Sequence, residues 1–107
     1  MRPLFIITAR GGSKGLPGKN IKEFNGKPLI CHSIDIARNF VKDEYVCVTT
    51  DDNEIAQTVQ NYGLQVPFIR PAELAPDTAS SQDVLIHAWK FYENKGANFD
   101  TIVLLQP

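Results

Sequence analysis

A buried strand that leads directly into a basic, glycine-rich loop constrains this chain more than any other feature. The apolar run at residues 4–7 predicts the strand, and residues 10–20 follow with four glycines and three cations, Arg10, Lys14 and Lys19. Glycine lets the backbone turn tightly and aim its N–H groups at a ligand without side chains in the way. Backbone donors and positive charge in one loop are suited to holding a polyphosphate.

Length and composition predict one soluble domain with a modest core. The longest apolar runs, residues 4–7 and 102–105, are far shorter than the roughly 18 residues of a membrane span. The N-terminus lacks the longer apolar region of a signal peptide. Cys31 and Cys47 fit neither a zinc site nor a redox pair, so we expect two small core residues and a cytoplasmic protein.

Charge is distributed unevenly although the net charge is only −1. Residues 1–34 carry six Lys and Arg against one acidic residue, whereas residues 35–107 carry five against eleven. The chain as a whole is therefore not expected to bind nucleic acid or a membrane. The positive charge gathers around the glycine loop, which favours a small anionic ligand.

Strands and helices are predicted to alternate along the chain. The expected strands are residues 4–7, 45–50, 65–69 and 101–106. The first helix is expected to start at Pro28 and to bury Ile30, Ile34, Ala37 and Val41. The second helix is expected to start near Asp51 and Asp52, to bury Ile55, Val59 and Tyr62, and to end at Gly63. The third is expected to have Ser80 as its cap and Asp83 in its first turn, to bury Val84, Ala88 and Phe91 or Tyr92, and to end near Gly96.

This order predicts the fold class α/β, a three-layer α/β/α sandwich around a mainly parallel, Rossmann-like sheet, because strands separated by helices pair in parallel through right-handed crossovers. The chain stops just past its fourth expected strand, where such sheets build their binding sites. We therefore expect the front part of a larger protein. Asp51 and Asp52, which follow a strand, could be metal ligands, but helix capping is the preferred interpretation.

Neither of two common phosphate-binding motifs is satisfied. The Rossmann spacing fails because Ser13 stands two residues after Gly11, and the P-loop fails because Asn20 follows Gly18-Lys19 where Ser or Thr should hold magnesium. A dehydrogenase and a P-loop ATPase are therefore disfavoured.

The loop instead resembles the signature of the acylneuraminate cytidylyltransferases, the CMP-sialic acid synthetases. Three ordered segments carry the resemblance across essentially the whole chain: residues 9–20 with 25–29, residues 70–81, and residues 104–107. The resemblance implies the nucleotide-diphospho-sugar transferase type of fold, with residues 1–107 as the N-terminal CTP-binding part of one domain. It implies transfer of CMP from CTP to a nine-carbon sugar acid, N-acetylneuraminic acid or a close relative, with release of pyrophosphate.

The resemblance also assigns residue roles. Arg10 and Lys19 are the candidates for catalytic charge stabilisation, and Arg70, the Ala79 backbone and Ser81 match positions that read cytosine. Gln106 matches a contact to the sugar acid. The remaining candidates for holding the nucleotide are Gly11, Gly12, Ser13, Lys14 and Asn20. The alternatives are that Lys14 and Lys19 are solvated loop lysines and that the cytosine segment is only a capped helix start.

Two further points bear on these expectations: the residues after the last strand, and the functional segments of the family that lie beyond this chain. The related Kdo synthetases have Gly-Asp after the last strand, whereas this chain has Gln106-Pro107, which favours the nine-carbon branch. The family's magnesium-binding aspartates and its dimerisation segment lie beyond residue 107. We therefore expect Mg²⁺ ligands outside this chain, a homodimer for the longer protein, and an inactive isolated fragment.

Other functions remain open at this stage. A non-catalytic nucleotide-binding module could keep the loop without the chemistry. A nucleotidyltransferase could use another base, and legionaminic or pseudaminic acid could replace N-acetylneuraminic acid as the acceptor.

Overall fold

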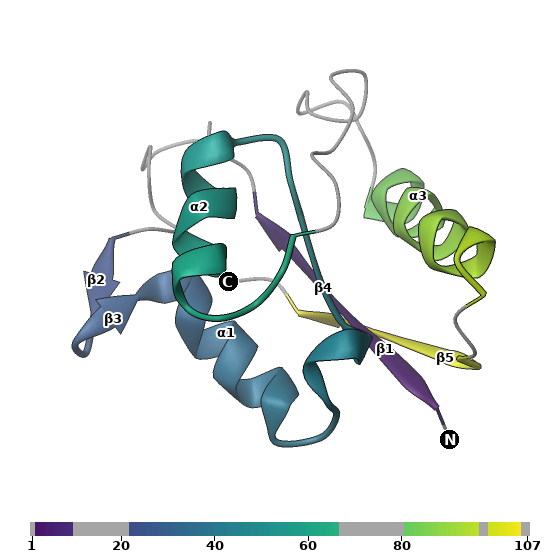
Figure 1. The fold of residues 1–107 in the computed structure, drawn as a ribbon, viewed down its shortest axis with the longest axis horizontal. Coiled ribbons are helices and arrows are strands. Elements are labelled where there is room, and N and C mark those ends of the chain that lie inside the picture. The colour runs from purple at the N-terminus through teal and green to yellow at the C-terminus, as the bar shows by residue number, and fades with distance from the viewer. Residues whose placement is uncertain (1, 10–21, 67–80, 97–98, 106–107) are drawn as a thin grey trace.

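A computed structural model describes residues 2–9, 22–66, 81–96 and 99–105 (Figure 1). Strands β1 (Pro3–Ala9), β4 (Val46–Thr50) and β5 (Thr101–Leu105) form a parallel sheet in the order β4-β1-β5. The predicted parallel α/β architecture is thus confirmed. No helix among these residues is long and apolar enough to cross a membrane.

Both faces of the sheet are covered, which explains why its strands read as continuous apolar runs. On one face, Phe5, Ile7 and Ala9 pack against α1 (Leu29–Arg38) and α2 (Asn53–Asn61). On the other face, Leu4 and Ile6 pack towards α3 (Ser81–Asn94). Figure 1 shows α1 and α2 together on one side of the sheet and α3 on the other. The arrangement is the expected three-layer sandwich.

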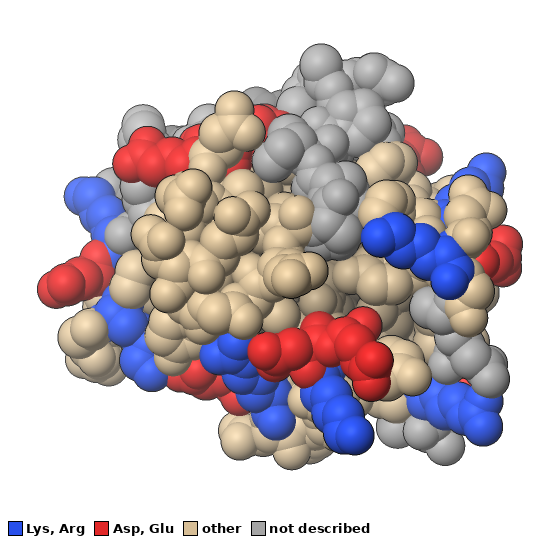
Figure 2. Space-filling model, viewed as in Figure 1, with Lys and Arg blue, Asp and Glu red and all other residues tan. Residues whose placement is uncertain are grey.

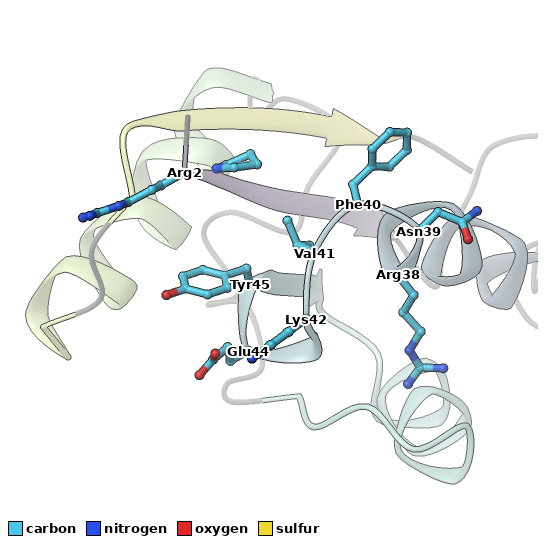
Figure 3. Close-up of a pocket in the computed structure, with 9 residues that line it drawn as sticks. Arg2, Arg38, Asn39, Phe40, Val41, Lys42, Glu44 and Tyr45 are labelled. Atoms are coloured by element: carbon cyan, nitrogen blue, oxygen red, sulfur yellow. The ribbon is translucent and has the colours of Figure 1, made fainter.

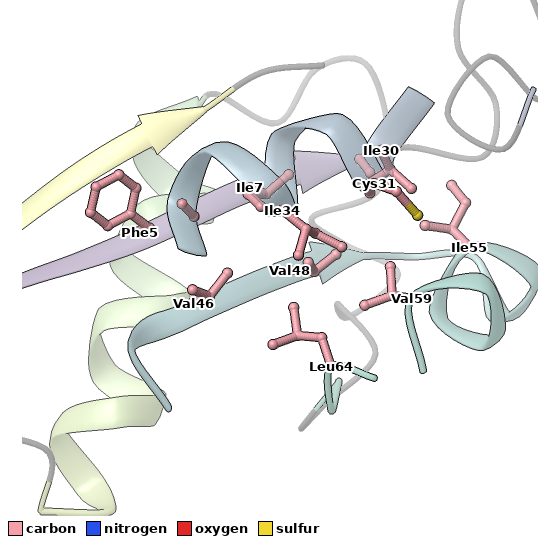
Figure 4. Close-up of a cluster of buried hydrophobic side chains, with 12 residues drawn as sticks. Phe5, Ile7, Ile30, Cys31, Ile34, Val46, Val48, Ile55, Val59 and Leu64 are labelled. Carbon is pink, nitrogen blue, oxygen red and sulfur yellow. The ribbon is translucent and has the colours of Figure 1, made fainter. Parts of the chain in front are cut away.

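The larger cluster joins the two helices to the sheet (Figure 4). Its members from α1, Ile30 and Ile34, are fully buried, and so is Val59 of α2. The buried stripes predicted for these helices from their spacing are confirmed within both helices, whereas Tyr62 lies at the C-cap of α2 and is only partly buried. Val41 also packs against this cluster, although it lies beyond the end of α1 at Arg38.

A small antiparallel hairpin, β2 (Glu23–Phe24) and β3 (Lys27–Pro28), precedes α1. Asn25 and Gly26 form its turn with φ angles of 52° and 91°. Positive φ at both positions is the geometry of the hairpin turns that favour Asn-Gly. Pro28 ends β3 with ψ of 143° and caps α1, so the expectation that Pro28 is the first helical residue was wrong by one position.

The segment after α2 differs from the sequence prediction. Gly63 has φ of 91°, and the Leu64 N–H donates to the Val59 carbonyl, so the helix ends where Gly63 predicted. Gln65 and Val66 are in no strand, and residues 67–69 lie outside the described residues. The strand expected at residues 65–69 is therefore wrong for its first two residues. Val66 still packs against the core, which accounts for its apolar character without sheet pairing.

Both cysteines are buried, as expected from the sequence. Burial raises the pKa of Cys47 to about 12 and raises that of Cys31 as well. At pH 8 a thiol with a pKa near 12 is ionised to only about 10⁻⁴, and the thiolate is the nucleophile. We expect iodoacetamide to leave both cysteines unmodified in the native protein while both react in urea. Peptide mass mapping checks this, and rapid native labelling of Cys47 would contradict the packing of α3 on the sheet.

Candidate nucleotide-binding site

The carboxyl ends of the three parallel strands meet at one edge of the sheet. Ala9 at the end of β1 pairs with Thr50 at the end of β4, and Leu105 at the end of β5 pairs with Ile7. The chain runs from β1 to β4 through α1 on one face, then crosses back to β5 through α3 on the other. In α/β sheets the ligand crevice lies at such a reversal, here between β1 and β5.

Most residues predicted for the site lie outside the described residues. This holds for Arg10, Gly11, Gly12, Ser13, Lys14, Lys19, Asn20, Arg70, Ala79 and Gln106. The structure fixes the points from which they depart: Arg10 directly follows Ala9, and Gln106 directly follows Leu105. Ser81 is the first residue of α3, and Asp83 lies in its first turn, whereas the expected cap Ser80 is outside the described residues. The assigned roles stay predictions.

The glycine-rich segment is flanked by fixed residues. Before it, Ala9 is buried in the central strand β1. After it, the Lys22 carbonyl accepts a hydrogen bond of 2.9 Å from the backbone N–H of Leu29, the first residue of α1. The hairpin β2–β3 lies between these two residues, and its Phe24 carbonyl accepts from Nε2 of His32 on α1.

A polar cluster that the sequence did not reveal lies beside this hairpin. The Lys27 ammonium contacts Oδ2 of Asp35, and the Tyr62 hydroxyl donates to Oδ1 of the same carboxylate at 2.7 Å. Lys27 also donates to the Tyr62 hydroxyl at 3.3 Å. The three residues come from β3, α1 and the end of α2. Asp35 and Tyr62 are 27 positions apart, so neither helical nor strand periodicity relates them.

The contacts of this cluster shift the two charged groups in opposite directions. The hydrogen bond with Asp35 raises the pKa of Lys27, and the same bond lowers the pKa of Asp35. The favourable contribution of Asp35 is therefore complete above its ordinary pKa of 3.8 and is lost as pH falls through the lowered value. The favourable contribution of Lys27 is complete below its ordinary pKa of 10.5 and is lost as pH rises through the raised value. The pair is charged at neutral pH.

Asp52 caps α2 at the edge of the sheet where β1 ends at Ala9 and β4 ends at Thr50. Its Oδ1 accepts from the Glu54 N–H at 2.8 Å, and its own N–H donates to the Thr50 hydroxyl at 3.1 Å. The preferred capping interpretation is confirmed for Asp52. Among the described residues, no group of three His, Cys, Asp or Glu could hold a metal ion.

Substitutions of Asp52 separate capping from a metal role. Asp52→Ala is expected to lower the free energy of unfolding by about 0.5–2 kcal/mol because the Glu54 N–H loses its partner. Asp52→Asn is expected to keep both stability and activity because asparagine caps equally well. Urea unfolding together with turnover of the full-length protein checks this. Normal stability with lost turnover in Asp52→Asn would instead indicate a metal ligand.

One hollow among the described residues lies at the opposite edge of the sheet (Figure 3). It measures about 660 Å³ and is lined by the start of β1, the end of α1 and the connection to β4. Of the three cations that line it, Arg2, Arg38 and Lys42, Arg38 is paired with the carboxylate of Asp43 at 2.9 Å. In the view of Figure 2, acidic and basic side chains of the described residues are interspersed rather than gathered in one basic patch. Because the hollow lies where β1 starts, it is not the site that the carboxyl ends of the strands indicate.

A parallel sheet with helices on both faces, followed at the end of its central strand by a basic glycine-rich segment, is typical of α/β proteins that bind nucleotides at this edge. The chain belongs to the cytidylyltransferase family, whose model matches residues 4–106. The match includes the first two segments on which the sequence resemblance rests, and the third as far as Gln106.

Curated relatives are about 40% identical to this chain over the aligned residues. It is 41% identical to the CMP-N,N'-diacetyllegionaminic acid synthase of Legionella pneumophila, over 100% of this chain and 46% of that protein. It is 41% identical to the pseudaminic acid cytidylyltransferase of Campylobacter jejuni, over 98% of this chain and 45% of that protein. It is 39% identical to the N-acylneuraminate cytidylyltransferase of Escherichia coli, over 95% of this chain and 23% of that protein. The chain thus spans less than half the length of these relatives.

A solved structure supports the fold. The chain superimposes on CMP:2-keto-3-deoxy-manno-octonic acid synthetase complexed with CTP, with a TM-score of 0.77 and 30% identity. The similarity covers 99% of this chain and 40% of that one. The architecture expected from the sequence is therefore that of a known CTP-complexed enzyme.

Proposed function

We propose that the protein containing this chain transfers CMP from CTP to a nine-carbon sugar acid and releases pyrophosphate. The observation that carries the proposal is the family match over residues 4–106, which includes the glycine-rich segment that starts at the carboxyl edge of β1. This chain would supply the CTP-binding part of the enzyme.

The reaction is a nucleotidyl transfer in which an acceptor oxygen displaces pyrophosphate. The anomeric hydroxyl oxygen of the sugar acid attacks the α-phosphorus of CTP, the bond from that phosphorus to the β-phosphate oxygen breaks, and the hydroxyl proton is lost. Because both reactants are anions, the enzyme must align them and balance the charge that develops on pyrophosphate.

The roles we propose for individual residues follow from their chemistry and position in the chain. Arg10 and Lys19 stabilise the developing negative charge. The segment's backbone N–H groups, together with Lys14 and Asn20, hold the triphosphate. Arg70, the Ala79 backbone and Ser81 recognise cytosine, and Gln106 contacts the sugar acid. Mg²⁺ would add charge neutralisation, but the described residues offer no group to hold it, so no step above depends on it.

For the acceptor, we propose N-acetylneuraminic acid or a close nine-carbon relative. Gln106-Pro107 in place of Gly-Asp supports a nine-carbon acid over Kdo. A legionaminic or pseudaminic acid is the second candidate, and the 41% identity to enzymes named for those acids supports it.

The test is a turnover assay on the full-length protein. We expect CTP, Mg²⁺ and a nine-carbon acid to give pyrophosphate and a CMP-sugar of the matching mass. The acids to compare are N-acetylneuraminic, N,N'-diacetyllegionaminic, pseudaminic and Kdo, with UTP, GTP and ATP as nucleotide controls. CTP binding in calorimetry without turnover on any acid would favour a non-catalytic module, and preference for another nucleotide would refute the cytidylyl assignment.

A further inference from the structure

The hairpin that follows the glycine-rich segment is too small to fix its own position. Each of its strands has two residues, and a two-stranded hairpin of this size is at best marginally stable in water. Its location must therefore come from contacts with the rest of the fold. Those contacts are the Leu29–Lys22 backbone bond, the His32 bond to the Phe24 carbonyl and the side chain of Lys27.

Lys27 connects the hairpin to both helices on this face of the sheet. Its ammonium meets Asp35 on α1 and the Tyr62 hydroxyl at the end of α2, and Tyr62 donates to the second oxygen of Asp35. The Lys27 ammonium also lies 5.8 Å from the centre of the Tyr62 ring. The three side chains close a ring of contacts that joins the hairpin to both helices on this face of the sheet.

The cluster is expected to contribute little to global stability, so its main effect is on the position of the hairpin. The side chains of Lys27 and Asp35 are 35% and 38% exposed, and ion pairs at such exposure contribute little to folding stability. By contrast, a misplacement of about 1 Å in a positioned reactant can cost roughly 100-fold in rate. A small change in the hairpin's position can therefore matter far more to a site beside it than to global stability.

We propose that Lys27, Asp35 and Tyr62 form a positioning cluster for the nucleotide site, one that fixes the end of the glycine-rich segment relative to the sheet. Ala9 in β1 holds the start of that segment, and the hairpin, tied down by the cluster, holds its end at Lys22. The ligand concerned is the triphosphate of a nucleoside triphosphate. The link to catalysis rests on the proposed function, whereas the anchoring of the segment does not.

The kinetic test compares two carboxylates in the full-length protein. Asp35→Asn is expected to lower kcat/KM for CTP about tenfold, mainly through a higher KM for CTP, with the KM for the sugar acid unchanged. Tyr62→Phe, which removes only the hydroxyl, is expected to have the same pattern with a smaller effect. Glu44→Gln is the matched control, because it removes one exposed carboxylate that lines the hollow at the opposite edge of the sheet. Equal kinetic effects of Asp35→Asn and Glu44→Gln would overturn the proposal.

A second measurement does not depend on activity. Arg10, Lys14 and Lys19 are trypsin sites within the flanked segment. Asp35→Asn is expected to speed cleavage there several-fold under native conditions, with little change in the urea midpoint, whereas Glu44→Gln leaves the rate unchanged. Unchanged cleavage in Asp35→Asn would refute the anchoring. Faster cleavage of Asp35→Asn, in a protein that forms no CMP-sugar, would refute the proposed function while supporting the anchoring role of the cluster.

Discussion

Arg10→Ala in the full-length protein is expected to lower kcat/KM for CMP transfer by about 10²–10³-fold, equivalent to about 2.7–4 kcal/mol of transition-state stabilisation. The reason is that pyrophosphate gains negative charge as its bond to the α-phosphorus breaks. A cation already positioned there stabilises this charge without any reorganisation of the site during the reaction. Arg10 directly follows the buried end of the central strand, so its backbone starts from a rigid position. Lys19→Met is expected to act in the same direction.

The matched control for both substitutions is Lys42→Met. Lys42 lines the hollow at the opposite edge of the sheet, so its removal changes the net charge equally without touching the strand ends. Initial rates over a range of CTP concentrations separate kcat from KM. If Arg10→Ala raised only KM and left kcat unchanged, Arg10 would bind CTP equally in the ground state and transition state and would not be the catalytic cation.

The parts of the fold that the sequence predicted are those governed by burial. Residues 4–7 read as a strand because both faces of β1 are covered, and the spacing of Ile30 and Ile34 reads as a helix because one face of α1 is. Gly63 and Gly96 mark helix ends because each adopts a positive φ that few other residues tolerate. In each case one local physical requirement decides the residue type.

The parts that escaped prediction depend on contacts between distant positions. Gln65 and Val66 were expected in a strand because a short apolar run does not distinguish sheet pairing from packing as extended chain. The hairpin escaped prediction because its two-residue strands, exposed in β2 and half-buried in β3, are too short to show an alternating pattern. The cluster of Lys27, Asp35 and Tyr62 needs the packing of α1 beside α2, which one sequence does not encode in any local pattern.

The location and the chemistry of the candidate site were predicted from different kinds of sequence information. Its location follows from topology, because parallel strands bring the residues after Ala9 and Leu105 to one edge of the sheet. Its chemistry came from ordered motifs rather than from periodicity. The individual roles assigned to Arg10, Arg70 and Gln106 stay predictions that the kinetic variants test.

Ile34→Ala is expected to lower the free energy of unfolding by about 2–5 kcal/mol. Ile34 is fully buried on α1 and points towards the sheet strands, between Ile7 of β1 and Val48 of β4 (Figure 4). Truncation removes apolar contacts and leaves a cavity that close-packed neighbours fill only in part. Ile34→Val, which removes one methyl group, is expected to cost about 0.5–1.5 kcal/mol.

Ile36 on the same helix supplies the control, because its side chain is 49% exposed. Ile36→Ala changes the same atoms and the same helix propensity, yet it is expected to shift stability by no more than about 0.5 kcal/mol. Urea unfolding of the three variants, at unchanged m-value, measures the differences. The contrast isolates burial from helix propensity, because alanine is the better helix former at both positions. Equal losses at Ile34 and Ile36 would contradict the packing of Ile34 against the sheet. The assignment of α1 to the layer that supports the end of the glycine-rich segment would then fail with it.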